Sequence, residues 1–241
     1  MFRHEIKSGR KGSGFDNAQY VAREGKYRHL GGLVHLEFGN LPKFAPDPFF
    51  LFRAADNHER RNGSVYREHL ITLPQGLTRD QYIEIARELA KDLAGPRPTI
   101  LAIHDKESSI EQVENPHLHL VTSDRIPDGI ERSAKQHFKR AHPTRPELGG
   151  CKKHSGGLEP VLIREQAKQQ RQTTERILNR KLAEYGRSDR VDARSLKDQG
   201  IKRSPERPLG KARIDRMTPT ERQAYVEARH RTRRGDRPAG E

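Results

Sequence analysis

Three histidines have the residue type and the spacing for a metal site. His117 and His119 are two residues apart in the apolar segment 117–123, and residues two apart in a strand project from the same face. His104 ends the preceding apolar segment, 99–104, and antiparallel pairing would bring it beside the other two. Three imidazoles from two neighbouring strands bind a divalent cation and leave coordination positions open, as catalysis requires. The alternative is three ordinary histidines in a half-buried sheet, because a short H-x-H motif alone is not specific.

Tyr20 is the candidate nucleophile. It lies in NAQYVAREGKY, on a predicted short helix. A phenol with its usual pKa of about 10 is a weak nucleophile, but a nearby metal or base activates it, and its phosphodiester adduct conserves the bond energy for later rejoining. A tyrosine on a short amphipathic helix is often a core residue instead, and Tyr27 is a second candidate. The basic residues that flank Tyr20 in the sequence are Lys7, Arg10, Lys11, Arg23 and Lys26.

Glu68 is a lone acid in the strand-like segment VYREHLITL. A carboxylate at this place can orient a metal ligand or accept the tyrosine proton. It can also simply face the solvent, and the sequence leaves these three interpretations open.

The elements that must position these residues follow from hydrophobic spacing and capping signals. Thr78, with Gln81 at the capping-box position, predicts a helix that ends before Gly95. Asp16 is the expected cap of the helix that carries Tyr20, and Gly25 its expected left-handed end. The further expected elements are strands at 2–7, 64–73, 99–104 and 117–123, helices at 47–62 and 159–185, and a surface loop at 133–157.

Composition favours one medium domain with a basic extension. The 241 residues are only 32% hydrophobic, too few for two full cores. Of the formal charge of +14, residues 151–241 carry +11, which is typical of a surface for a polyanion, although a solvated tail is the plainer interpretation. We expect a domain over residues 1–200, including the helix at 159–185, and a basic flexible tail over 201–241 with a short helix at 220–230.

The number of cysteines and the lengths of the apolar segments indicate which cellular compartment the protein occupies. Cys151 is the only cysteine, which excludes an intramolecular disulfide and a cysteine-based zinc cluster and fits a reducing cytoplasm. No segment approaches the length needed to span a bilayer, and the start lacks the apolar region of an export signal, so neither membrane insertion nor export is expected.

The sequence resembles a known family. QYVAREGKY, LAIH and NPHLHLVTSDRIPDGIERSAKQHFKR, in this order, look like the MobA/MobL relaxases of mobilisable plasmids, which are HUH endonucleases. The likeness is dense from residue 15 to 150 and continues more thinly to about residue 200. It implies an α+β fold, with an antiparallel sheet of about five strands flanked by helices, the palm-like fold of HUH relaxases, and a helical basic extension.

The resemblance also implies roles for residues. Tyr20 matches the nucleophile, His104, His117 and His119 match the metal triad, and Glu68 matches an acid in the same strand of relatives. The implied reaction nicks one DNA strand at a plasmid transfer origin, with Mn²⁺ or Mg²⁺ as the cofactor, and leaves a 5′-phosphotyrosyl DNA. The implied partners are single-stranded or hairpin origin DNA, accessory mobilisation proteins and a coupling protein, with possible transfer of the DNA-bound protein into a recipient cell.

We expect further basic residues, in the basic loops, to contact the DNA. They are Lys135, Lys139, Arg140, Lys152 and Lys153, in addition to the five that flank Tyr20. Three rival functions remain: a rolling-circle replication initiator or single-strand transposase, a non-catalytic origin-binding protein, and a phosphodiesterase that uses water. The first rival places its tyrosine after the histidines, whereas Tyr20 precedes His117.

Overall fold

Five strands form one antiparallel sheet. The computed structural model describes residues 2–106, 110, 113–202, 209 and 211–234. The strand order is β1-β3-β5-β4-β2, and every neighbouring pair is antiparallel. The strands are β1 (His4–Arg10), β2 (Leu33–Gly39), β3 (Ser64–Thr72), β4 (Thr99–His104) and β5 (His117–Ser123). The expected five-stranded antiparallel α+β architecture is therefore confirmed.

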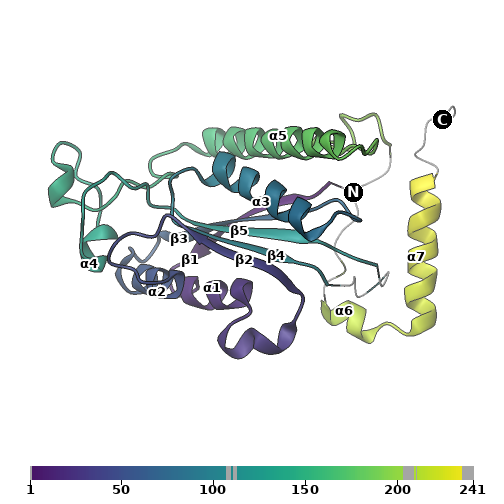
Figure 1. Ribbon diagram of the computed structural model, residues 1–241, viewed down its shortest axis with the longest axis horizontal. Coiled ribbons are helices and arrows are strands. Elements are labelled where there is room, and N and C mark those ends of the chain that lie inside the picture. Colours follow the sequence, from purple (N-terminus) through teal and green to yellow (C-terminus); the bar gives the residue numbers. More distant parts are fainter. Residues whose placement is uncertain (1, 107–109, 111–112, 203–208, 210, 235–241) are drawn as a thin grey trace.

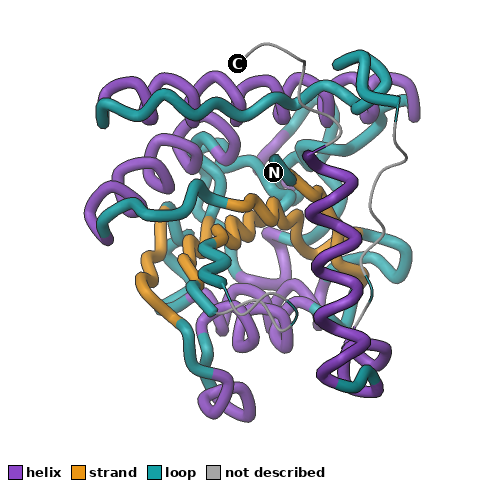
Figure 2. Tube along the Cα trace, turned by 90° about the vertical axis from the view of Figure 1, so that its right-hand side faces the viewer, coloured by secondary structure: helices purple, strands orange, loops and turns teal. Residues whose placement is uncertain are grey.

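Helices cover both faces of this sheet (Figure 1). One face carries α1 (Gly14–Ala22) and α2 (Pro48–His58), and the opposite face carries α3 (Arg79–Ala94) and α5 (Pro160–Glu184). The shorter helical segments are η1 (Gly25–Leu30), α4 (Ala134–His137) and η2 (Pro146–Leu148). Two further helices, α6 (Lys211–Arg216) and α7 (Pro219–Arg234), lie at one end of the molecule (Figures 1 and 2).

The alternation of side chains along β5 assigns its residues to the two layers. Leu118 and Leu120 are fully buried in the core formed with α3 and α5, where Leu89 also packs. Val121 points to the opposite face and packs with Ala18 of α1. His117 and His119 have the same parity as Val121, so both lie on the α1 face of the sheet.

The predicted capping box of α3 is confirmed, and α2 has a side-chain cap as well. Thr78 and Gln81 form the reciprocal capping box of α3, and Asp47 caps α2 by accepting a hydrogen bond from the amide of Phe50 at 2.7 Å. The prediction for α1 was wrong at both ends. The helix begins at Gly14, after the N-cap residue Ser13, so Asp16 lies inside its first turn.

The left-handed end of α1 is Arg23, with φ +56°, rather than Gly25. Gly25 also has a positive φ, but it begins η1. A left-handed non-glycine residue is uncommon, because Cβ approaches the carbonyl oxygen in this conformation. Helix α2 ends at His58, earlier than the predicted residue 62, because Glu59 has extended backbone torsions.

The C-terminal part of the described chain is more helical than expected. The sequence predicted a flexible tail with a helix at 220–230, and the structure has both α6 and the longer α7 in this part. The division of the chain into domains at residue 200 stays a prediction. Of the helices that the structure describes, none combines the length and the apolar character needed to cross a membrane.

Candidate metal centre and nucleophile

The pairing of β4 with β5 brings the three predicted histidines together. His104 is the direct cross-strand partner of His117, and Ala102 is the partner of His119. The three rings are mutual neighbours, with centroids 4.6 Å apart for His104 and His119 and 5.1 Å apart for His117 and His119. One ligand atom from each ring lies within 4.8 Å of the others. This separation suits three imidazoles around one ion, so the predicted metal triad assembles as a cluster.

Hydrogen bonds on the outer side of the cluster orient two of the rings. The Nδ1 atom of His119 lies 2.6 Å from Oε1 of Glu68, and both side chains are buried. His117 donates from Nδ1 to the backbone carbonyl of Asn115 at 2.7 Å. In each ring the proton is therefore held on Nδ1, and Nε2 keeps the lone pair that a metal ion needs.

The Nε2 atom of His119 is a test of whether the residues fit an ion. It is buried and has no hydrogen-bond partner among the described residues. A buried polar atom without a partner is costly unless a water or an ion satisfies it. The donor set of three imidazoles, with a carboxylate behind one of them, fits a divalent cation of the transition series, including Mn²⁺.

Burial keeps the imidazoles in the form that binds metals. Desolvation lowers the pKa of His104 to about 3, and electrostatic interactions with the neighbouring His119 and Arg23 lower it as well. Desolvation also lowers the pKa of His117 to about 4. Both rings are therefore neutral at physiological pH, and metal binding there does not have to displace a proton from either.

Tyr20 lies directly against this cluster. Its ring contacts the ring of His119 edge-on, with centroids 6.1 Å apart, and 37% of the residue is exposed. The ring of Tyr27 packs edge-on against the other side at 5.3 Å, and its hydroxyl donates to Asp16 at 2.7 Å. Tyr20 is thus the tyrosine that combines proximity to the histidines with access to solvent, while Tyr27 is engaged by a carboxylate.

An anchor that sequence reasoning missed fixes the start of α1. The Asp56 carboxylate, on α2, accepts hydrogen bonds from the amides of Gly12, Gly14 and Phe15 at 2.7, 3.0 and 2.9 Å. It therefore satisfies amides that the first turn of α1 leaves unpaired and places a negative charge at the positive end of the helix dipole. These amides of the glycine-rich segment before α1 are therefore not free to bind a phosphate.

Comparison with known proteins decides the family. The MobA/MobL family profile matches residues 10–218, which is most of the chain. A 43 kDa relaxation protein of Salmonella typhimurium is 39% identical over 202 residues, which are 82% of this chain and 54% of that protein. The chain belongs to the MobA/MobL family. A Mobilization protein A of Escherichia coli is 42% identical over 196 residues, 80% of this chain and 26% of that protein.

This MobA/MobL chain therefore spans about half of the first relative and about a quarter of the second. A solved structure described as "Molecular Basis of Vancomycin Resistance Transfer in Staphylococcus aureus" has a TM-score of 0.58 at 24% identity. It covers 81% of this chain and 99% of the solved chain. The likeness shows that the two chains share a fold, in agreement with the antiparallel α+β architecture that the sequence predicted.

The predicted DNA contacts near the MobA/MobL site lie in different environments. Lys7 is exposed on β1, where it pairs with Glu68 in the strand register. Lys26 is exposed and forms an ion pair with Asp16, while Lys11 donates to a backbone carbonyl of α2. Arg10 is exposed at the end of β1. Arg23 instead points into the histidine cluster.

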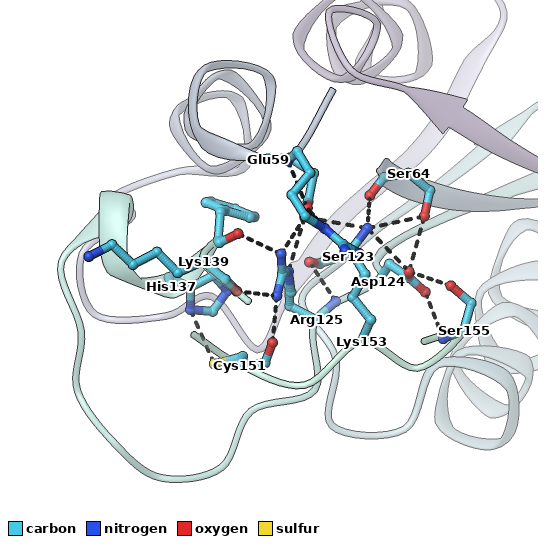
Figure 3. A network of polar contacts seen from close by, with 12 residues as sticks. Glu59, Ser64, Ser123, Asp124, Arg125, His137, Lys139, Cys151, Lys153 and Ser155 are labelled. Carbon is cyan, nitrogen blue, oxygen red and sulfur yellow. Dashed lines mark hydrogen bonds and ion pairs between the residues drawn. The ribbon is translucent and has the colours of Figure 1, made fainter. Parts of the chain in front are cut away.

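A buried polar network fixes the segment 126–157, which follows β5 (Figure 3). Arg125 is 2% exposed and binds the equally buried Glu59 at 2.6 Å. The same guanidinium donates to the backbone carbonyls of Phe138, Lys139 and Cys151 at 2.6 to 2.8 Å. Arg125 therefore joins the end of α2 to three points of the segment, and no local sequence signal indicates a contact 66 residues apart.

Lys153 is a correction to the predicted DNA contacts. Its ammonium group donates to the Ser64 carbonyl at 2.6 Å and lies 3.4 and 3.7 Å from carboxylates of Glu59 and Asp124 (Figure 3). Only 9% of the residue is exposed, so this lysine belongs to the internal network. The other predicted contacts in this part of the chain are exposed: Lys135, Lys139, Arg140 and Lys152.

Proposed function

We propose that this chain is the nicking domain of a plasmid relaxase, which cuts one strand of a transfer origin and keeps the cut end as a phosphotyrosyl adduct. The single observation that carries the proposal is the packing of the partly exposed Tyr20 against His119 of the histidine cluster. A phosphate that contacts this hydroxyl would also lie beside the imidazoles. The names of the two mobilisation relatives and the family profile support the same function.

The reaction is a transesterification. The Tyr20 oxygen attacks the scissile phosphorus, the bond from phosphorus to the 3′-oxygen breaks, and the phenolic proton ends, in net balance, on the released 3′-hydroxyl. The 5′ side stays bonded to Tyr20, so the phosphodiester energy is conserved for rejoining. His104, His117 and His119 would hold a divalent cation, Mn²⁺ or Mg²⁺, which would supply Lewis-acid stabilisation of the developing charge.

Glu68 acts as a positioning residue. Its carboxylate accepts the Nδ1 proton of His119 and so fixes which nitrogen faces the cluster. The Asn115 carbonyl does the same for His117. Of the three roles that the sequence left open for Glu68, this one agrees with its burial and its short hydrogen bond.

Exposed basic side chains bind the DNA backbone and bring the strand to Tyr20. They include Lys7, Arg10 and Lys26 near the site, and Lys135, Lys139, Arg140 and Lys152 on the segment anchored by Arg125. Phosphate contacts of this kind position the strand and make binding dependent on salt. The partners are origin DNA, accessory mobilisation proteins and a coupling protein. The protein acts in the bacterial cytoplasm and enters a recipient cell on the DNA.

Two other functions make different predictions. A phosphodiesterase that uses water would cut the strand and leave no protein on it. A non-catalytic origin-binding protein would bind DNA and leave it intact, with or without Tyr20.

The test is adduct formation with a 3′-labelled origin oligonucleotide on a denaturing gel, run with and without Mn²⁺. The wild type gives a shifted band only with metal, Tyr20→Phe and His119→Ala give none, and all three bind the oligonucleotide. Tyr27→Phe is the matched control, because it removes the neighbouring hydroxyl and should keep the adduct. A cut strand without a shifted band, or an adduct with Tyr20→Phe, would refute the proposal.

A further inference from the structure

Arg23 makes an unusual set of contacts beside the candidate nucleophile. Its Nη1 donates to the Tyr20 carbonyl at 2.9 Å and its Nε to the Gly31 carbonyl at 3.2 Å. Its Nη2 lies 2.9 Å from Nδ1 of His104. The guanidinium carbon is 4.7 Å from the centroid of the Tyr20 ring. All three nitrogens of one cationic group are therefore committed to the nucleophile's helix, the following turn and a metal-triad histidine.

The contact with His104 fixes the protonation of that ring. A guanidinium can only donate, so Nδ1 of His104 is the acceptor and carries a lone pair. The proton is then on Nε2, which donates to the carbonyl of Val21 at 2.8 Å. Nδ1 is consequently the atom of His104 that can bind a metal ion, and Arg23 occupies it.

His104 therefore differs from the other two histidines of the triad. The Nδ1 atoms of His117 and His119 face the Asn115 carbonyl and the Glu68 carboxylate. Each of these contacts orients its ring and leaves Nε2 for a metal ion. The contact of Arg23 instead uses the lone pair itself. It also places the permanent positive charge of the guanidinium where the metal ion would bind.

We propose that Arg23 is a catalytic residue with two positions, an inference that rests on the proposed relaxase function. In the first position it holds His104 Nδ1, and a divalent cation must displace it to complete the triad. In the second position the released guanidinium binds the scissile phosphate beside Tyr20.

The backbone supports the second position. Arg23 has φ +56°, a left-handed conformation that is unfavourable for residues with a side chain. Where such a residue lies next to a reactive group, its backbone conformation suggests a functional role. Only two residues separate it from Tyr20, and its side chain already lies over the face of that ring. A guanidinium displaced from His104 thus remains within reach of a phosphate at the Tyr20 hydroxyl, and its planar donors match phosphate oxygens.

Competition at His104 couples the binding of metal and DNA. In the free protein, binding of the ion breaks the contact between Arg23 and His104 without replacing it. In the protein bound to DNA, the released guanidinium can bind a phosphate instead. DNA therefore raises metal affinity, and metal raises DNA affinity by the same factor. Removing the guanidinium should tighten metal binding to the free protein and abolish this mutual enhancement.

The experiment is titration calorimetry of Mn²⁺ into the full chain, both alone and saturated with an origin oligonucleotide. In this oligonucleotide a methylene phosphonate replaces the scissile phosphodiester, so that the strand cannot be cleaved. Wild type should bind Mn²⁺ more tightly with the oligonucleotide, by about five-fold or more, the lower range for coupled sites. Without DNA, the Arg23→Gln variant should bind Mn²⁺ more tightly than the wild type does. Adding the oligonucleotide should then change the Mn²⁺ affinity of this variant by less than about two-fold.

Two further variants separate a specific effect from a folding defect. Arg23→Gly removes the guanidinium and suits the left-handed conformation, so it should keep the end of α1 and reproduce the result of Arg23→Gln. Arg28→Gln is the matched control, because Arg28 is exposed and pairs with Glu24 rather than with the histidines. Unchanged or weaker Mn²⁺ affinity in both Arg23 variants, or coupling that persists in them, overturns the inference. Adduct formation by the wild type tests the proposed function separately, so the two can fail independently.

Discussion

The bond between Glu68 and His119 gives a metal-affinity prediction whose magnitude follows from the structure. Glu68→Ala leaves the buried Nδ1–H of His119 without its acceptor, which costs about 1–3 kcal/mol. The ring can avoid this cost by turning or by moving its proton to Nε2, and either change removes the lone pair from the cluster. The variant must reverse this change before His119 can bind the ion, and this costs free energy. The affinity for Mn²⁺ should therefore fall by about 10- to 100-fold, the range observed when a hydrogen-bond partner of a metal ligand is lost.

Glu68→Gln separates orientation from charge. The glutamine carbonyl can accept the same hydrogen bond, so the protonation of His119 is preserved and the loss of affinity should be less than about ten-fold. Glu37→Ala is the matched control, since Glu37 lies 3.0 Å from His35 on β2, in a second carboxylate–histidine pair outside the triad. Calorimetric titration with Mn²⁺ measures all three variants. Wild-type affinity in Glu68→Ala would refute the argument, as would an equal loss in Glu37→Ala.

Three more predictions concern stability and DNA binding. Burial lowers the pKa of His4 to about 4, and burial also holds the pKa of its hydrogen-bonded neighbour His69 well below the ordinary value of a histidine. Both histidines stay neutral in the folded chain, whereas in the unfolded chain they are protonated below about pH 6.5. The free energy of unfolding, measured in urea, should therefore be highest above about pH 6.5 and decrease as the pH falls toward 4. A free energy of unfolding that does not change over this range would contradict the prediction. Asp56→Ala should lower the free energy of unfolding by about 2 kcal/mol and reduce adduct formation, unless α1 holds its place without the cap. Lys152→Ala should reduce the salt dependence of DNA binding by about one phosphate contact at unchanged stability, whereas Lys153→Ala should lower stability and leave that salt dependence unchanged; the reverse result would show that the burial assignment is wrong.

The sequence predicted those features that depend on local pattern or on one strand pairing. The Thr78 capping box needs only residues within one turn, and it forms as expected. The histidine cluster needs one antiparallel pairing of two strands that follow each other in the chain, and this pairing forms as expected. The motif around Tyr20 makes it the candidate nucleophile, and in the structure its ring lies against His119.

Features that depend on distant partners could not be predicted. The cap of α1 is the Asp56 carboxylate, more than 40 residues away, rather than the nearby Asp16. Lys152 and Lys153 are adjacent and chemically identical, and only the packing of Glu59 against the segment 126–157 makes one exposed and the other buried. Arg23 was expected to face DNA, and its contact with His104 depends on how the end of α1 meets the sheet.

Helix α2 connects the two regions that the proposed function requires. Asp56 and Glu59 are three residues apart at its end, but the first holds the helix of Tyr20 and the second holds Arg125. Loss of Asp56 should release the helix of the candidate nucleophile Tyr20, while the proposed DNA contacts on the anchored segment remain in place. Loss of Glu59 leaves the Arg125 charge buried without its partner and frees the segment, which should weaken DNA binding before it affects an adduct formed at saturating DNA. The two carboxylates therefore separate positioning of the candidate nucleophile from positioning of the DNA, although one lies in the last turn of α2 and the other is the residue that ends it.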